Sequence, residues 1–254
     1  MTALEQRPPA RPRRARRRRG HGLSAALGVL GELLITAGVL LALFVVWQLW
    51  WTDVEAGRHQ QETLAGWRGQ DEVVAAPAQE GERRTDPPPL PGPLADGEVF
   101  GALHVPRISD APLASIAHGV GMDDVLNRGY IGHYPQTQLP GETGNFATAA
   151  HRQSYGAVYR EIEAIVPGDE IIVETDGAYL VYETVEHEIV HPSQTQVLAP
   201  VPNQPGVAPT EATITLTTCH PLFSAAERWI TYGELAYWID KAEGMPAALL
   251  EAER

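Results

Sequence analysis

Residues 170–185 read EIIVETDGAYLVYETV, and this stretch decides the fold class. Two runs rich in β-branched and aromatic residues flank Asp176-Gly177, a dipeptide that is a strong signal for the tight turn of a β-hairpin. Outside the hairpin, short apolar-alternating runs continue and are broken by Gly, Pro, Asn and Asp. Many short strands with regular turns predict an all-β barrel or sandwich.

The alternation also predicts the individual strands. They are residues 99–106, 112–117, 146–150, 156–164, 170–175, 178–190, 212–219 and 227–239. Residues 121–128 are predicted to form a short helix. We assign residues 98–244 to one β-rich domain of ordinary length and residues 245–254 to a C-terminal tail.

Charge is distributed unevenly along the 254 residues, whose formal net charge is −13. The first 20 residues contain eight Arg and one Glu, whereas residues 52–254 contain 11 Lys and Arg against 30 Asp and Glu. Because an acidic folded region repels the phosphates of nucleic acids, we predict no nucleic-acid partner.

Residues 23–51 read LSAALGVLGELLITAGVLLALFVVWQLWW and predict a transmembrane helix, since about 20 apolar residues span the hydrocarbon core of a bilayer. Three tryptophans crowd the C-terminal end, where their rings favour the membrane interface. Glu32, the one charge in the run, is expected to snorkel or to be protonated. A cleaved signal peptide would have an apolar core of about 7–15 residues followed by small residues, so we favour an uncleaved anchor.

The segments on either side of this helix set its orientation. The basic tail, residues 1–22, is placed in the cytoplasm by the positive-inside rule, so the chain after Trp51 lies outside the cell membrane, which it crosses once. Residues 52–73 are polar, and residues 74–97 contain six prolines. This composition predicts that residues 52–97 form an extracellular, semi-rigid stalk before the β-rich domain.

Cys219 is the only cysteine, which excludes an internal disulfide and a CxxC zinc site. It ends the predicted strand ATITLTTC and precedes His220-Pro221, where a regular strand is disfavoured. Taken alone, such a cysteine is most simply a small buried hydrophobe. A strand end beside a proline-containing loop is also where a nucleophile would be exposed, and Arg228 follows nine residues later in another β-rich run.

His151 ends the run GNFATAAH and supplies a third group for a nucleophilic site. A cation beside a cysteine favours the thiolate, which is the nucleophilic form. A histidine can protonate a leaving amine, and Arg228 can hold substrate carbonyls or a developing oxyanion.

Several motifs together resemble the sortase family. TLTTC with an Arg nine residues on resembles the TLxTC…R signature of sortases, and GHYPQTQLPGETGNFATAAHR (132–152) resembles the segment around their catalytic histidine. GHYP, LPGExGNF, HRxxYG, PGDEIIVET and TLTTCHP are most similar to class E sortases of high-GC Gram-positive (actinobacterial) bacteria. The resemblance covers residues 98–240, and the motifs are specific in combination rather than singly.

The resemblance implies an eight-stranded β-barrel with short helices and the activity of a cysteine transpeptidase. Cys219 would be the nucleophile, His151 the general acid/base and Arg228 the cation that orients substrate or stabilises the oxyanion. Cys219 would cleave between Thr and Gly in a C-terminal sorting signal of the LAxTG or LPxTG kind. An amine of peptidoglycan, or of its lipid-linked precursor, would then resolve the thioacyl enzyme. Thr218 and His220 are expected to contact substrate as secondary residues.

Other polar residues near these motifs have simpler interpretations. His220 adjoins Cys219, but neighbours on an extended chain point apart, so it is not favoured as the base. His133 is expected to be structural, and Arg152 to form a salt bridge. Some sortases bind calcium through loop carboxylates, but the acidic pairs here indicate a solvated acidic face: Asp123, Asp124, Asp169 and Glu170. We therefore predict no metal and no cofactor.

The sequence argues against two other functions. An L,D-transpeptidase would show a His and a Gly shortly before the cysteine and an Arg two residues after it, whereas threonines precede Cys219 and Pro221 stands at the second position. A non-enzymatic β-domain that binds a cell-wall partner would not need the combination of Cys, His and Arg. The expected partners are thus secreted proteins that carry sorting signals, an amine acceptor, and the membrane.

Overall fold

The structure is a computed structural model that describes residues 21–70, 75–108 and 113–252. By their internal contacts the residues fall into two units, 1–48 and 49–254. The second unit holds the β-structure and every site discussed below.

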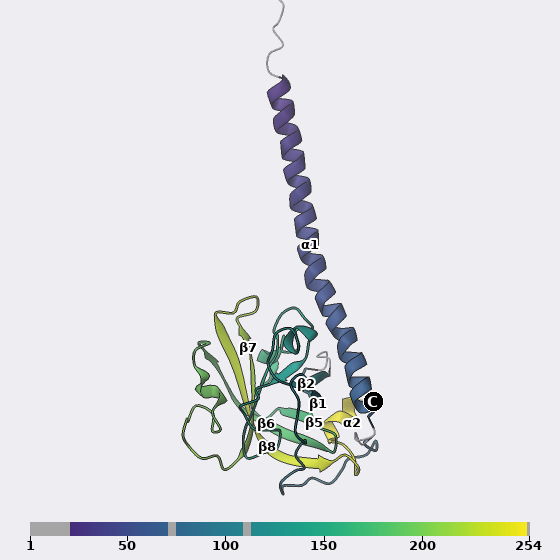
Figure 1. Cartoon of the computed structure of the whole chain (residues 1–254), viewed down its shortest axis with the longest axis vertical. Coiled ribbons are helices and arrows are strands. Elements are labelled where there is room, and N and C mark those ends of the chain that lie inside the picture. Colours follow the sequence, from purple (N-terminus) through teal and green to yellow (C-terminus); the bar gives the residue numbers. More distant parts are fainter. Residues whose placement is uncertain (1–20, 71–74, 109–112, 253–254) are drawn as a thin grey trace, which may run out of the picture. The chain divides into compact units, whose positions relative to one another are not determined.

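Eight strands close into a barrel in the order β1-β2-β3-β4-β7-β8-β6-β5 (Figure 1). The strands are β1 (Val99–His104), β2 (Ala114–His118), β3 (Ile131–His133), β4 (Gly144–Ala149), β5 (Glu170–Glu174), β6 (Ala178–Val190), β7 (Ala212–His220) and β8 (Glu227–Asp240). Three short 3₁₀ helices are η1 (Leu126–Arg128), η2 (Ile162–Ala164) and η3 (Thr195–Leu198). The predicted all-β barrel is confirmed.

One hairpin of the barrel is the one that Asp176-Gly177 predicts. β5 and β6 pair antiparallel, with Glu174 opposite Tyr179, and β6 continues into a long antiparallel pairing with β8. Two neighbouring pairs, β2–β3 and β4–β7, are parallel. The interior is filled by apolar side chains that alternate inward along the strands, such as Phe146, Leu180 and Ile214, each of which is fully buried.

Three local predictions differ from the structure. Residues 156–164, predicted as a strand, form turns and η2, because four consecutive residues, 154–157, adopt positive φ and break any extended run. β3 is only three residues long and was not predicted. The helix predicted at 121–128 is reduced to η1, preceded by turns.

Helix α1 (His21–Arg68) begins in the first unit and ends in the second. Its apolar part is long enough to cross a membrane, as the sequence predicts. Between residues 27 and 47 its large apolar side chains are exposed, for example Leu33 at 62%, and so is Trp50 at 62%. A large exposed apolar surface of this kind marks contact with a membrane or with another protein.

The last part of α1, residues 53–68, lies against the barrel within the second unit. Ala56, Gln60, Leu64 and Trp67 are all buried, and their spacing of three or four residues marks one face of a helix. The polar composition of residues 52–68 predicts an exposed stalk, but the few apolar residues fall on a single stripe and pack. This segment is therefore helical and attached to the barrel.

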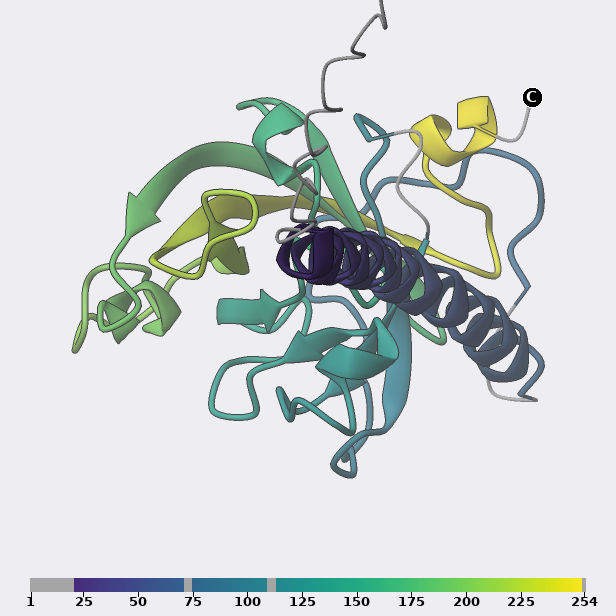
Figure 2. The same ribbon diagram turned by 90° about the horizontal axis from the view of Figure 1, so that it is seen from above.

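Parts of the chain before and after the barrel also pack on it. Arg84 forms a bridge with Trp238, whose indole Nε1 donates to the Asp86 carbonyl at 2.6 Å. At the other end, Met245 is buried, and so is Leu249 in the short helix α2 (Ala247–Ala252). The proline-containing stretch up to residue 97 thus wraps the domain over at least part of its length, and Figure 2 shows it running around the barrel.

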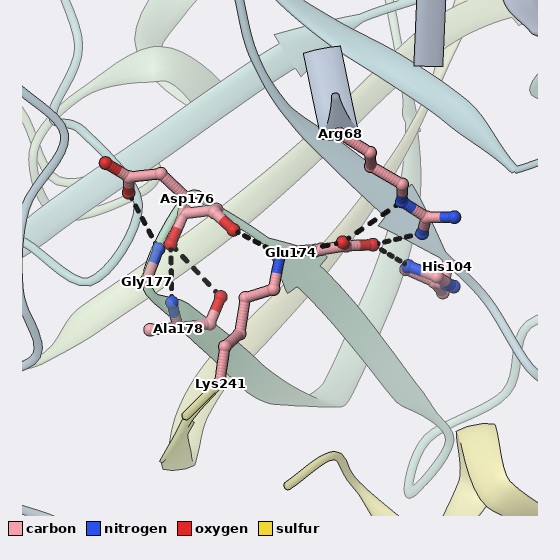
Figure 3. Close-up of polar contacts among 8 residues, drawn as sticks. Arg68, His104, Glu174, Asp176, Gly177, Ala178 and Lys241 are labelled. Atoms are coloured by element: carbon pink, nitrogen blue, oxygen red, sulfur yellow. Dashed lines mark hydrogen bonds and ion pairs between the residues drawn. The ribbon is translucent and has the colours of Figure 1, made fainter. Parts of the chain in front are cut away.

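A buried ion cluster joins α1 to the barrel (Figure 3). The Glu174 carboxylate, 2% exposed, accepts from Arg68 at the end of α1 and from His104 of β1, and pairs with Lys241 at 3.0 Å. Lys241 is also buried and donates to the Thr175 carbonyl. Burial by itself would raise the pKa of Glu174, but the bonds from His104 and Arg68 and the charge of Lys241 outweigh it and lower the pKa to about 2.

Candidate active site

Three adjacent strands bring Cys219, His151 and Arg228 to one end of the sheet. Cys219 in β7 lies directly opposite Arg228 in β8. On the other side, β4 runs parallel to β7 with Ala149 opposite Thr217, so that His151 and Cys219 each follow this pair by two residues. Parallel neighbours leave a sheet at the same edge, which places the cysteine between the histidine and the arginine.

The thiol of Cys219 is reduced and partly exposed. Side chains alternate along β7, and Leu216 is part of the barrel core. Cys219 therefore shares a face with Thr217, whereas Thr218 and His220 share the opposite face with Leu216. This arrangement leaves Cys219 partly exposed near the end of β7, where a nucleophile can meet a substrate.

His151 is held by two neighbours: Asn127, in the loop that contains η1, and Tyr155, in the loop that follows β4. Its Nε2 lies 3.0 Å from Oδ1 of Asn127, and its ring stacks on Tyr155 with centroids 5.3 Å apart. An amide oxygen only accepts hydrogen bonds, so Nε2 carries a proton and Nδ1 is the basic nitrogen of the neutral ring. Burial lowers the pKa of His151, which favours this neutral form at neutral pH.

Arg228 is oriented by the loop that joins β7 to β8. One guanidinium nitrogen, Nη1, donates to the carbonyls of Ala225 and Glu227, at 3.0 and 2.9 Å. In the same loop Phe223 is 70% exposed, and its backbone N–H donates to Oε1 of Gln153. The loop after the cysteine is thus tied to the loop after the histidine, and both border the same edge of the sheet.

Thr218 and His220, the expected secondary substrate residues, lie away from the thiol. The Thr218 hydroxyl is buried and donates to the Ala150 carbonyl at 2.7 Å, which ties β7 to the end of β4. His220 contacts the guanidinium of Arg152 at 2.9 Å and lies 3.3 Å from the Glu163 carboxylate. In the structure both side chains make contacts within the protein.

Arg152 forms the salt bridge that the sequence predicts. Its guanidinium is 3% exposed and pairs with Glu163 at 2.6 Å. It also donates to the carbonyl of Cys219 at 3.3 Å. Arg152 thus supports the backbone that carries the cysteine, whereas Arg228 is the residue directly opposite Cys219 on the neighbouring strand.

The side chains of His133 and Asp169 are held by contacts within the protein. His133 is 1% exposed and bonds to the Gln138 carbonyl and to His118, and its burial lowers its pKa to about 4. Asp169 is paired with Arg107 at 2.7 Å. Across residues 21–70, 75–108 and 113–252, the structure groups no three His, Cys, Asp or Glu side chains in a way suited to a metal.

Asn127 and Tyr155 are functional candidates that the sequence analysis does not assign. Asn127 lies 24 residues before His151, in a segment predicted only as a helix, so no local pattern connects the two. Tyr155 belongs to the HRxxYG motif, and this motif is the sequence feature that could have indicated its role. Together they fix the orientation of the imidazole, a requirement for general acid–base chemistry.

Comparisons with known proteins agree with this geometry. Residues 103–236 match the family model described as "Sortase domain". The chain is similar to Sortase SrtE1 of Streptomyces coelicolor, with 37% identity over 94% of this chain and 65% of that protein. It is also similar to Sortase SrtE2 of the same organism, with 38% identity over 87% of each chain. Thus the chain spans slightly less than two thirds of the length of SrtE1.

A solved structure shows the same similarity in three dimensions. The SrtA sortase from Actinomyces oris is 44% identical and superposes with a TM-score of 0.64, covering 66% of this chain and 96% of that one. The family model begins only at residue 103, after helix α1, whereas the similarity to SrtE1 extends over 94% of this chain. The family model therefore covers most of the barrel, including the edge that carries Cys219.

Proposed function

The chain belongs to the sortase family of cysteine transpeptidases, and on that premise we propose that it joins secreted proteins to the cell wall through a thioacyl intermediate on Cys219. Its substrate is a C-terminal sorting signal of the LAxTG or LPxTG kind, cut between Thr and Gly. The observation that carries the proposal is the register of β4, β7 and β8, which sets Cys219 between His151 and Arg228.

In the first half of the reaction the Cys219 sulfur attacks the carbonyl carbon of the Thr residue. The thiol proton passes to Nδ1 of His151, the nitrogen left free by the bond to Asn127. The guanidinium of Arg228 stabilises the oxyanion of the tetrahedral intermediate. When the C–N bond breaks, the imidazolium donates its proton to the leaving amine of Gly, and a thioester remains.

In the second half a primary amine resolves the thioester. His151, again neutral, accepts a proton from the acceptor amine as its nitrogen attacks the thioester carbonyl. The new amide bond forms and the Cys219 thiolate leaves, so the enzyme is regenerated. We propose an amine of peptidoglycan, or of its lipid-linked precursor, as the acceptor.

The proposed location follows from helix α1. Its apolar part is long enough to span a membrane once, and the basic tail before it favours a cytoplasmic N-terminus. The barrel would then lie outside the cell, where sorting signals and cell-wall amines meet.

A panel of sorting-signal peptides tests this proposal. The full chain is incubated with peptides that carry Ala or Pro at the second signal position, with and without an amine acceptor such as a glycine or diaminoacid peptide. Mass spectrometry should detect a fragment that begins with Gly, and with acceptor present a new amide at Thr. Cleavage at another bond, or no covalent adduct on Cys219 in a trapped reaction, would refute the assignment.

Replacing Arg228 with Ala is expected to reduce kcat by about 10²–10³-fold, the typical effect of losing one oxyanion-stabilising group. Because Arg228 is partly exposed and donates only to two loop carbonyls, thermal unfolding should shift little. Arg228→Lys, which retains the charge but not the planar donors, should recover part of the rate. A large fall in the melting temperature instead would identify Arg228 as a structural residue.

A further inference from the structure

We propose that the end of α1 that packs on the barrel, through Asp53, Ala56 and Gln60, positions His151 for catalysis. The inference rests on the proposed function of His151 as acid/base. These residues do not touch the imidazole. They hold the two loops whose side chains do, the loop of Asn127 and the loop of Tyr155.

Gln60 secures the loop that carries Asn127. Its side chain is 3% exposed, and Nε2 donates to the carbonyl of Gly129, two residues after Asn127. Its Oε1 accepts from the backbone N–H of Ser115 at 2.9 Å, so both ends of the amide are used. One turn further along α1, the Thr63 hydroxyl bonds to the Tyr130 hydroxyl at 2.7 Å. The Asn127 loop is thereby attached to the helix at two consecutive residues, 129 and 130.

Asp53 secures the loop that follows His151. Its Oδ1 accepts from the backbone N–H of Gly156 at 3.1 Å, and its Oδ2 pairs with Arg160 at 3.0 Å. Residues 154–157 all have positive φ, a conformation that needs surrounding contacts to be maintained in residues other than Gly. Tyr155, which stacks on His151, is inside this stretch.

Ala56 is the point where both loops meet the helix. A Cβ placed on Gly129 would lie 3.0 Å from the Ala56 Cβ and 3.0 Å from the Tyr155 carbonyl oxygen. A Cβ placed on Gly156 would lie 3.2 Å from the same Ala56 Cβ. The methyl group of Ala56, which is 5% exposed, therefore lies close to two glycines, one from each loop.

This arrangement relates the helix to catalysis in a direct physical way. A misplacement of about 1 Å in a catalytic group can cost on the order of 10²-fold in rate. The imidazole orientation depends on a hydrogen bond from one loop and a ring contact from the other, and α1 sets the distance between those loops. The packed end of α1 thus acts as a positioning element of the site.

The test compares Ala56→Leu with Ala65→Leu in the full chain in detergent micelles. Both changes add the same atoms to the same helix, but Ala56 is 5% exposed whereas Ala65 is exposed. Ala56→Leu should lower kcat for peptide cleavage about tenfold with little change in KM. The acidic limb of its pH profile should move to higher pH, because separated loops hydrate His151 and its pKa rises towards the ordinary value. Ala65→Leu should match the unmodified chain.

A second pair of variants guards against a simple loss of folding. Asp53→Ala removes the acceptor for Gly156, whereas Asp53→Asn retains an oxygen there and loses only the pairing with Arg160. The Ala variant should show a several-fold lower kcat, and the Asn variant should recover most of it. A merely structural salt bridge would make the two variants equally slow, which would overturn the proposal.

Hydrogen exchange gives a readout that does not depend on activity. Peptides covering residues 126–131 and 151–158 should exchange faster in Ala56→Leu than in Ala65→Leu. Unchanged exchange, or faster exchange with unchanged kcat and pH profile, would overturn the positioning role. If the unmodified chain cleaves no sorting peptide, the proposed function fails on its own, while the exchange comparison still decides whether α1 holds these two loops.

Discussion

Replacing Cys219 with Ala should reduce peptide cleavage on the order of 10⁴–10⁶-fold, the effect of removing the nucleophile from a catalytic unit. The thioacyl intermediate cannot form without the sulfur, and the chain has no second cysteine to substitute for it. Since the side chain is partly exposed and small, the variant should remain folded, with a melting temperature close to that of the unmodified chain. Release of the Gly-containing fragment, measured by mass spectrometry, is the assay.

Cys219→Ser provides the matched control for size. The hydroxyl preserves the shape of the side chain but is a far weaker nucleophile at neutral pH, so it should be as inactive as the Ala variant. Continued cleavage of a sorting peptide by either variant would contradict the assignment of Cys219 as the nucleophile. Loss of cleavage with intact peptide binding would support the nucleophilic role directly.

Replacing Glu174 with Gln is expected to destabilise the fold by about 3–5 kcal/mol, because it leaves the buried Lys241 ammonium without its counter-charge. Denaturant unfolding of the full chain measures this difference. The apolar double variant Glu174→Leu/Lys241→Met should be closer to the unmodified chain, since it removes the buried ammonium together with the carboxylate and leaves only the partly exposed Arg68 and His104 without their partner. Equal destabilisation of single and double variants would show that packing, rather than charge, sets the cost.

The same carboxylate makes a pH dependence that can be measured. Its pKa is lowered from 4.5 to about 2 in the folded chain. The contribution of this carboxylate to the free energy of unfolding is therefore complete above about pH 4.5 and is lost as pH falls towards 2. In this window the stability of the unmodified chain should decline relative to Glu174→Gln, which has no carboxylate to protonate. Parallel pH curves for the two proteins would contradict the lowered pKa.

Strong local signals made most of the barrel predictable. The hairpin around Asp176-Gly177 was found with the bounds 178–190 for its second strand, because side-chain alternation and turn chemistry agree there. Residues 156–164 misled the prediction, since apolar residues such as Val158 and Ile162 are buried against the end of the barrel without being in a strand. β3 is too short to show any alternation.

Only those residues of the site that lie on consecutive strands could be brought together from the sequence alone. Cys219 and Arg228 lie on consecutive strands, and the intervening residues bring them into register across one loop. The pairing of β4 with β7 joins residues far apart in sequence, so the sequence alone could not place His151 beside Cys219. Its role was predicted from the resemblance to the family instead. Asn127 and the buried face of α1 carry no comparable signal in the sequence. Their roles depend on contacts between loops that are far apart along the chain.

One feature of the ion cluster bears on how such an enzyme avoids modifying itself. A transpeptidase that resolves its thioester with primary amines is exposed to any lysine on its own surface. Here the chain contains a single lysine, Lys241, and that ammonium is 1% exposed and enclosed by Glu174 and the Thr175 carbonyl. The basic side chains elsewhere are arginines, whose guanidinium groups stay protonated and do not attack thioesters. An acyl group on Cys219, as proposed, would therefore meet no competing lysine side chain on the protein that carries it.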